Sequence, residues 1–101
     1  MSSVLGTDPK ERKGIPIYSG VIAYFPRALA AVAKLSKAGN DQHNPGKPLH
    51  WDRSKSGDEL DALMRHVVDG DWDAVAWRAL AHLEKELENA DEDHVAVRSG
   101  N

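Results

Sequence analysis

The sequence has no cysteine among its 101 residues. The chain therefore has no disulfide, no thiol nucleophile and no thiolate ligand for a metal, which fits a reducing compartment. A chain of this size buries roughly 60% of its surface on folding and is marginally stable without a disulfide, a metal or a partner subunit. With disulfides excluded, we expect a bound ion or a homo-oligomer, a dimer or larger.

The chain also lacks an excess of positive charge and any long apolar run. Its net charge is −3, so it has no general basic field to attract a nucleic-acid polymer. No segment approaches the roughly 20 apolar residues of a membrane span, and no signal-peptide pattern opens the chain. We expect a soluble, cytoplasmic protein with neither a nucleic-acid polymer nor a membrane as partner.

Three segments have the pattern of a helix, whereas no segment has the alternating β-branched pattern of a strand. The first begins at Pro26 and is expected to stop at Gly39, the second runs from near Ser56 to Asp69, and the third from about Asp71 to Leu87. Residues 15–20 are predicted to be extended. The predicted fold is all-α: a small bundle of three main helices, with a long polar loop between the first and second, completed by oligomerisation.

Apolar residues at helical spacing predict which faces of the last two helices form the core. We expect flexible ends at residues 1–14 and 89–101 around a single domain at 15–88. The predicted core stripes are Leu60, Leu63, Met64 and Val67 in the second helix, and Trp72, Ala76, Ala79, Leu80, Leu83 and Leu87 in the third.

The residues that could take part in catalysis or in binding a metal or ligand are concentrated between Gly39 and His66. Asp58, Glu59 and Asp61 open the second helix, where two carboxylates at positions i and i+3 can hold one divalent cation together with substrate phosphates. The alternative is an acidic first turn that favours the helix dipole, with an ion pair between Asp61 and Arg65. Spacing alone leaves both interpretations open.

Histidines and amides surround this acidic turn. His43, His50 and His66 have spacings that match no zinc motif, and a single histidine such as His66 is often a packed, hydrogen-bonded residue. Trp51 either plugs the loop onto the core or stacks on a base. Amide side chains of the loop could form hydrogen bonds with the edge of a base. The nearby cations could bind phosphates, or they could belong to an ordinary solvated surface. The amides are Asn40, Gln42 and Asn44, and the cations are Arg27, Lys34, Lys37, Lys47, Arg53 and Lys55.

The order of these elements resembles a known family. The pattern FPxAL…AxxSxxGNxQHNPGxPLHWDRxKSxDxxDALMRH, followed by VAWRALAxLExxLE, is similar to the phage and bacterial dATP/dGTP diphosphohydrolase N-terminal-domain family, a relative of the MazG-like all-α pyrophosphohydrolases. The resemblance covers residues 14–88. It implies a cytoplasmic enzyme, in the host cytoplasm if phage-encoded, that cleaves a (deoxy)nucleoside triphosphate between its α and β phosphates with Mg²⁺ or Mn²⁺.

The resemblance also implies which residues belong to the site. The site loop would include Asn40, Gln42, His43, Asn44, Trp51, Asp52, Arg53 and Lys55, and the site helix would carry Asp58, Asp61, Arg65 and His66. As an enzyme, the chain would use this region in the following way. The metal ligands would be Asp58, Glu59 and Asp61; the substrate would meet Asn40, Gln42, Asn44, Trp51, Arg53 and Lys55; the catalytic residues would be His43, His66 and Arg65. His43 and His66 are alternative proton acceptors.

Two other functions remain open. The helix that begins at Pro26 carries no acid before Gly39, although MazG-like enzymes usually place a glutamate cluster there. This favours a non-catalytic module that captures a nucleotide or a nucleotide-derived signal, as a phage sponge does. The third possibility is a structural helix bundle whose loop packs against a partner subunit.

Overall fold

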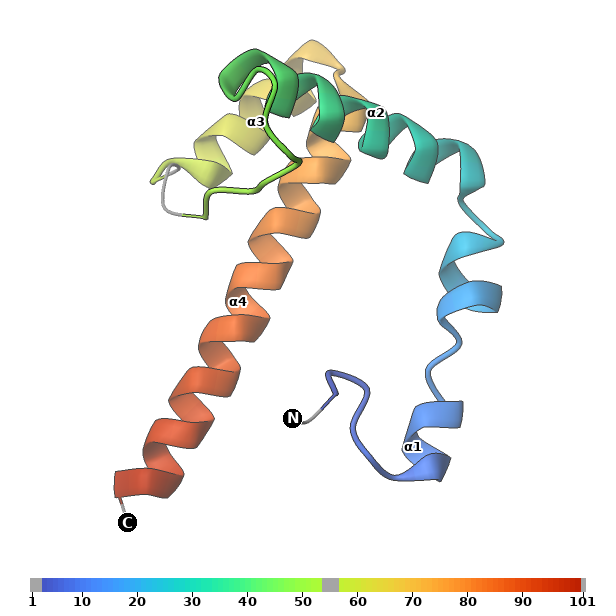
Figure 1. Ribbon diagram of the computed structural model, residues 1–101, viewed down its shortest axis with the longest axis vertical. Coiled ribbons are helices and arrows are strands. Elements are labelled where there is room, and N and C mark those ends of the chain that lie inside the picture. The colour runs from blue at the N-terminus through green and yellow to red at the C-terminus, as the bar shows by residue number, and fades with distance from the viewer. Residues whose placement is uncertain (1–2, 54–56, 101) are drawn as a thin grey trace. The chain divides into compact units, whose positions relative to one another are not determined.

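The computed structural model describes residues 3–53 and 57–100, with side chains described as far as Asp91. All regular structure in these residues is helical (Figure 1): α1 (Pro9–Lys13), the π-helical turn η1 (Tyr18–Ile22), α2 (Pro26–His43), α3 (Glu59–Asp69) and α4 (Trp72–Gly100). The predicted all-α fold is confirmed, with three main helices and a long loop between the first and second of them.

The chain divides into two compact units, Met1–Ala30 and Ala31–Asn101. In the first unit, no residue from 3 to 30 is buried. Asp8 caps α1 by accepting a hydrogen bond from the Glu11 N–H. Residues 15–20, which were predicted to be extended, instead include the first part of η1.

Gly20 explains the π-helical turn. Its N–H donates to the Pro16 carbonyl at 2.7 Å, and the Ala23 N–H donates to the Tyr18 carbonyl at 2.7 Å, five residues back. A Cβ at position 20 would lie 3.1 Å from Pro16 Cγ, so a glycine permits this close approach. A single π-helical turn has no apolar periodicity, so it cannot be predicted from the sequence pattern.

Helix α2 continues past its predicted stop at Gly39 and ends at His43. The end is set by Pro45, because a proline disfavours the helical conformation at the residue before it. Gly46 has φ +75°, which supports the turn that follows, and the Lys47 N–H donates to the Asn44 carbonyl at 3.0 Å. Because of this extra turn, Asn40 and His43 lie on α2, whereas they were predicted to lie in the loop.

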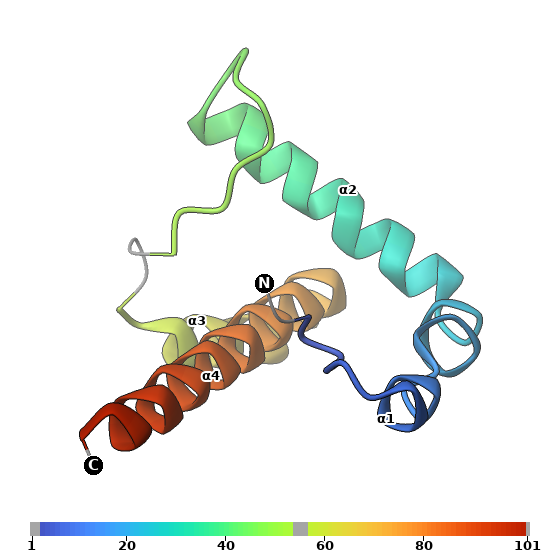
Figure 2. The same ribbon diagram turned by 60° about the horizontal axis from the view of Figure 1, so that its bottom comes forward.

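Helices α3 and α4 form a hairpin joined at Gly70. This glycine has φ +76°, and the N–H groups of Gly70 and Asp71 donate to the carbonyls of Val67 and His66, which closes α3 with a left-handed cap. Figures 1 and 2 show α3 lying alongside the first part of α4, and this is the main contact between helices in the described residues. Helix α4 runs beyond its predicted end at Leu87.

The core differs from the predicted one. The buried apolar residues of the described chain are Ala62, Ala74 and Ala81, and the only buried polar residue among them is Asn40. Most of the larger apolar residues of α3 and α4 are exposed, whereas Leu63, Val75 and Trp77 are half-buried. Of the predicted core residues, Leu60, Met64, Val67, Trp72, Leu80, Leu83 and Leu87 are exposed.

No described helix taken alone has the length and apolar character to cross a membrane. The bent pair Pro9–Ile22 and Pro26–His43 meets the criterion jointly, by length and composition only.

Replacing Gly70 or Gly39 by alanine should change the free energy of unfolding in opposite directions. Gly70→Ala places a Cβ on a left-handed residue and should lower the free energy of unfolding by about 1 kcal/mol. Gly39→Ala lies inside α2 with open space around the new Cβ, and should raise it by roughly 0.5 to 1 kcal/mol. Urea denaturation of the two variants checks the signs, and a stabilised Gly70→Ala protein would contradict the assigned cap.

Candidate functional site

The buried side chain of Asn40 holds the loop that follows α2. Its Nδ2 donates to the Lys47 carbonyl at 3.2 Å, and its Oδ1 accepts from the His50 N–H at 3.2 Å. Asn44 Nδ2 also approaches this oxygen, at 3.4 Å. The amide predicted to read a base edge is therefore engaged by the chain itself, and it fixes the course of residues 44–50.

Trp51 anchors the next part of the loop onto α4. Its ring meets Trp77 edge-on, with centroids 5.8 Å apart and planes at 79°. The Arg53 guanidinium lies 4.2 Å from the centroid of the Trp51 ring, and Lys85 Nζ lies 6.0 Å from it. Arg53 also pairs with Glu88 at 3.1 Å. Of the two interpretations of Trp51, this arrangement matches a plug that seats the loop.

Beneath the loop lies a hollow of about 720 Å³, which is within the roughly 300–1,000 Å³ of small-molecule sites. We call it the loop hollow. Residues from the C-terminal half of α2, the loop, α3 and one side of α4 line it, and all of them belong to the unit Ala31–Asn101. The lining residues are Leu35, Ser36, Gly39, Asn40, His43, Asn44, Leu49, His50, Trp51, Asp52, Asp58, Glu59, His66, Ala74, Trp77, Arg78 and Lys85.

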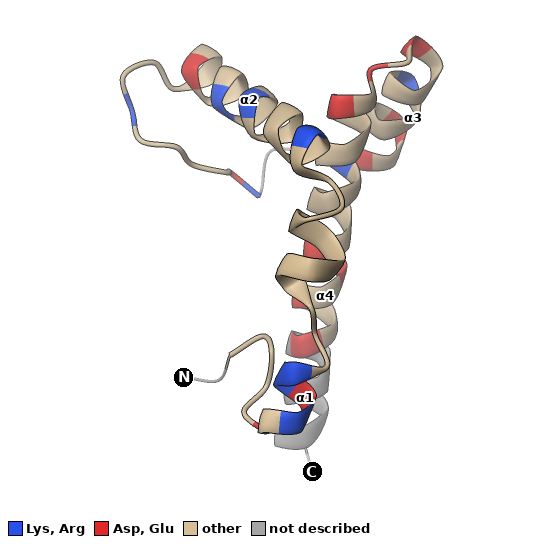
Figure 3. Cartoon of the chain, turned by 90° about the vertical axis from the view of Figure 1, so that its right-hand side faces the viewer, with Lys and Arg blue, Asp and Glu red and all other residues tan. Residues whose placement is uncertain are grey.

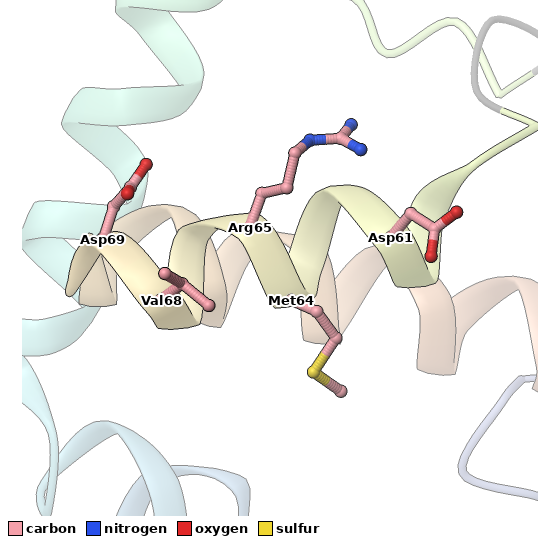
Figure 4. Close-up of a pocket in the computed structure, with 5 residues that line it drawn as sticks. All are labelled: Asp61, Met64, Arg65, Val68 and Asp69. Carbon is pink, nitrogen blue, oxygen red and sulfur yellow. The ribbon is translucent and has the colours of Figure 1, made fainter.

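The structure brings seven of the predicted site residues to this hollow and leaves four elsewhere. Those in the lining are Asn40, His43, Asn44, Trp51, Asp58, Glu59 and His66. Gln42 is exposed on α2, and Arg53 is engaged with Trp51 and Glu88. Asp61 and Arg65 instead line a separate open depression on α3, together with Met64, Val68 and Asp69 (Figure 4). Lys55 lies outside the described residues.

Three lining residues of α4 were missed by the sequence analysis as site residues: Trp77, Arg78 and Lys85. Arg78 and Lys85 are seven residues apart and so share one side of the helix. That pattern also describes a solvated helix face, and nothing in the sequence shows that the loop folds back over it. By contrast, Arg27, Lys34 and Lys37 are exposed on α2 and outside the lining. Figure 3 shows lysine and arginine positions in blue along α2.

The carboxylates predicted to hold a metal do not converge. Arg65 Nη2 donates to Asp58 Oδ2 at 2.9 Å, Glu59 pairs with Lys85 at 2.6 Å, and Asp61 faces the other depression. In the described part of the chain, no three histidine, aspartate or glutamate side chains gather as a metal site would require. These residues as arranged do not fit a resident Mg²⁺ or Mn²⁺.

The charges of the loop hollow are largely held in pairs. The hydrogen bond from Arg65 lowers the pKa of the Asp58 carboxyl below its ordinary value of 3.8, and the positive charges of Arg65 and Arg78 act in the same direction. His82 Nδ1 lies 3.9 Å from Glu59, which is already bonded to Lys85. A bound anion would therefore compete with protein carboxylates for these cations.

The three histidines differ in their surroundings. His66 is half-buried, and its Nδ1 lies 3.2 Å from Asp71 Oδ2, as expected for a packed, hydrogen-bonded residue. His43 and His50 are exposed at the wall of the hollow, one at the end of α2 and one in the loop. Both imidazoles are therefore accessible to a ligand that enters it.

The chain matches no protein-family model, and neither curated proteins nor solved structures give a significant match. The resemblance to the dATP/dGTP diphosphohydrolase N-terminal-domain family therefore stays a prediction.

Loss of the Asn40 amide should release the loop. Asn40→Ala removes two part-buried hydrogen bonds, to the Lys47 carbonyl and from the His50 N–H, which should lower the free energy of unfolding by about 1–3 kcal/mol. Amide hydrogen exchange at His50 should accelerate. Gln42→Ala removes an exposed amide of the same helix and is the control. Unchanged exchange in Asn40→Ala would contradict the role of this side chain.

The Asp58–Arg65 pair should be visible in an acid titration. Because the folded pKa of Asp58 lies below its unfolded value, the pair stabilises the fold above pH 3.8, and this contribution disappears as the pH falls through the folded pKa. Arg65→Gln should raise the pKa of Asp58, as measured by NMR of the side-chain carboxyl carbon. Lys37→Gln, which removes the partner of Asp41, should leave the Asp58 titration unchanged. An unshifted Asp58 in Arg65→Gln would show that the pair does not form in solution.

Proposed function

We propose that the chain binds a nucleotide in the loop hollow. The observation that carries the proposal is the composition of this single cavity. Cations from α4, exposed imidazoles and indole rings line a space that is large enough for a small molecule. These are the groups that meet phosphates and a base. They are Arg78, Lys85, His43, His50, Trp51 and Trp77.

In this proposal the phosphates meet α4. The Arg78 guanidinium can bond two phosphate oxygens at once, and Lys85 adds a second positive charge about two turns further along the helix. Lys85 is bonded to Glu59 at 2.6 Å, so a phosphate would replace that carboxylate or share the ammonium with it. The base would lie against the apolar wall that Trp77 and Leu49 provide.

The resemblance gives separate support. The shared His-Asn-Pro-Gly and Trp-Asp-Arg elements include His43, Asn44 and Trp51, and all three line the loop hollow. Asp58 and His66, which belong to the later part of the same pattern, line it as well. Asn40 and Trp51 act in this proposal by holding the loop in place, which preserves the shape of the site.

A second candidate is hydrolysis of the nucleotide between its α and β phosphates. The observation that favours it is that Asp58 and Glu59 line the same cavity as His43 and Arg78. The substrate would be the metal–nucleotide complex, since Mg²⁺ is commonly held by one or two carboxylates together with phosphates. Both carboxylates would first have to part from Arg65 and Lys85.

Calorimetric titration with each NTP and dNTP, with and without Mg²⁺, tests the binding proposal. We expect saturable binding that persists without metal. Arg78→Gln should weaken it about tenfold or more, because a hydrogen bond to a charged group contributes about 1.5–3 kcal/mol. Lys34→Gln removes an exposed cation outside the hollow and should leave the affinity unchanged. Absence of saturation at millimolar nucleotide would refute the proposal and leave the structural helix bundle.

Chromatography of the ligand after incubation separates the two candidates. A binding module returns the triphosphate intact. Metal-dependent release of monophosphate and pyrophosphate would establish the hydrolase, and in that case Asp58→Asn and Glu59→Gln should abolish turnover while binding without metal persists. Turnover that survives both substitutions would remove these carboxylates from the reaction.

A further inference from the structure

The first unit of the chain, Met1–Ala30, has an exposed apolar segment between cations. Residues 14–26 contain no charged side chain, whereas α1 before them has three cations and Arg27 follows them directly. Figure 3 shows blue positions on α1 and neither blue nor red through η1. We call residues 15–25 the apolar segment. Its large exposed side chains are Ile15, Ile17, Tyr18, Val21, Ile22, Tyr24 and Phe25.

The large side chains of the apolar segment gather on one side of a helical turn. The Phe25 N–H donates to the Val21 carbonyl at 3.0 Å, which continues the helical pairing beyond η1. Ile17, Val21 and Phe25 are therefore about one turn apart and lie on the same side. The ring of Tyr24 meets that of Phe25 edge-on, with centroids 5.9 Å apart. The positions left between Ile17 and Phe25 without a large side chain are occupied by Ser19, Gly20 and Ala23.

The described part of the first unit does not cover this side. None of residues 3–30 is buried, and the seven large side chains of the apolar segment are 43 to 71% exposed. Together they leave several hundred Å² open, as much as the roughly 300–600 Å² of the largest apolar patch on a typical monomer, which is often functional. Helical pieces as short as α1 and η1, five residues each, are also unstable alone in water. A surface that covers the segment would stabilise both.

The charges around the apolar segment have the opposite sign to the chain as a whole. Residues 9–27 contain four cations and one acid, Glu11, which gives a net charge of +3, whereas the whole chain has −3. No further acid follows until Asp41. The Arg12 guanidinium donates to the Gly6 carbonyl at 2.8 Å, and this neutral acceptor does not cancel its charge. The four cations are Lys10, Arg12, Lys13 and Arg27.

We propose that residues 9–27 bind the surface of an anionic phospholipid bilayer. The isoleucine, valine and phenylalanine side chains enter the headgroup region, the tyrosine hydroxyls stay at its polar edge, and the cations meet lipid phosphates. A bilayer fits cations on both sides of an apolar segment, because its phosphates surround every inserted apolar group. A protein partner would need an apolar groove of matching shape with acids at both ends.

Binding at the bilayer surface requires no spanning helix. The expectation of no membrane partner rested on the lack of a long apolar run, which has no bearing on a contact of this kind. The proposal is also independent of nucleotide binding, because the residues of the loop hollow belong to the other unit.

Co-sedimentation of the full chain with vesicles tests the proposal. We expect binding to vesicles of phosphatidylcholine mixed with phosphatidylglycerol. Binding should be at least tenfold weaker with phosphatidylcholine alone, or in about 1 M NaCl, where the Debye length is about 3 Å. Lys10→Gln combined with Lys13→Gln should weaken binding about tenfold or more, and Phe25→Ser several-fold. Lys47→Gln and Leu60→Ser make the same kinds of change at exposed residues of the other unit and should leave binding unchanged.

Three results would overturn the proposal. Absence of binding to the mixed vesicles at millimolar lipid would favour an acidic protein as the partner. Equal binding to both lipid compositions would show that the cations have no part in the contact. Loss of binding in Leu60→Ser but not in Phe25→Ser would assign the contact to α3.

A fluorescent label measures insertion without removing any of the cations. Because the chain has no cysteine, Ile22→Cys has a single thiol in the apolar segment, and Gln42→Cys has one on the exposed surface of α2. With the mixed vesicles, the emission of a nitrobenzoxadiazole label at position 22 should move to shorter wavelength and be quenched by spin-labelled lipid, whereas a label at position 42 should not respond. Equal quenching at the two positions would overturn the proposal. So would an emission at position 22 that is already shifted before lipid is added, since the chain itself would then cover the segment.

Discussion

The packing of α3 against α4 is the contact on which the rest of this region depends, because it is the main contact between helices in the described residues. The buried apolar residues of the described chain are Ala62, Ala74 and Ala81, and Asn40 is the buried polar residue among them. The hairpin supplies residues of both helices to the loop hollow, and the loop after α2 completes its lining.

The loop hollow depends on two anchors of different kinds. Asn40 fixes the first part of the loop by hydrogen bonds to backbone groups, and Trp51 fixes the second part by its contacts with Trp77 and Arg53. A long polar loop lacks the repeated backbone pairing of a helix, so individual side chains must supply its order. In this chain the residues that resembled ligand-reading groups carry out that task.

Much of the fold could be predicted because its signals are local. Apolar periodicity and Gly70 predicted the extent of α3 and the start of α4, and Pro26 predicted the start of α2. The end of α2 was misplaced because Gly39 is compatible with a helix interior, where Asn40 and His43 then serve the loop. The predicted core was wrong: most residues of the two apolar stripes are exposed, since the pattern specifies an apolar face and not what covers it.

The candidate site was only half predictable for a similar reason. The sequence grouped residues that are adjacent along the chain, and His43, Trp51 and Asp58 do meet in one cavity. Asp61 was included by its spacing from Asp58, yet it projects to another side of α3. Arg78 and Lys85 come from a segment 20 to 30 residues further on, and only the folding of the loop over α4 brings them in.

The edge-on contact of Trp51 with Trp77 allows circular dichroism to report whether the loop is packed against α4. Two indoles with centroids 5.8 Å apart and planes at 79° have neighbouring, non-parallel electronic transitions. Such a pair produces an exciton couplet in circular dichroism, which vanishes when the rings separate. The third tryptophan, Trp72, is exposed at the start of α4 and has no described ring partner. The position of the loop can therefore be followed by circular dichroism without attaching a label to the chain.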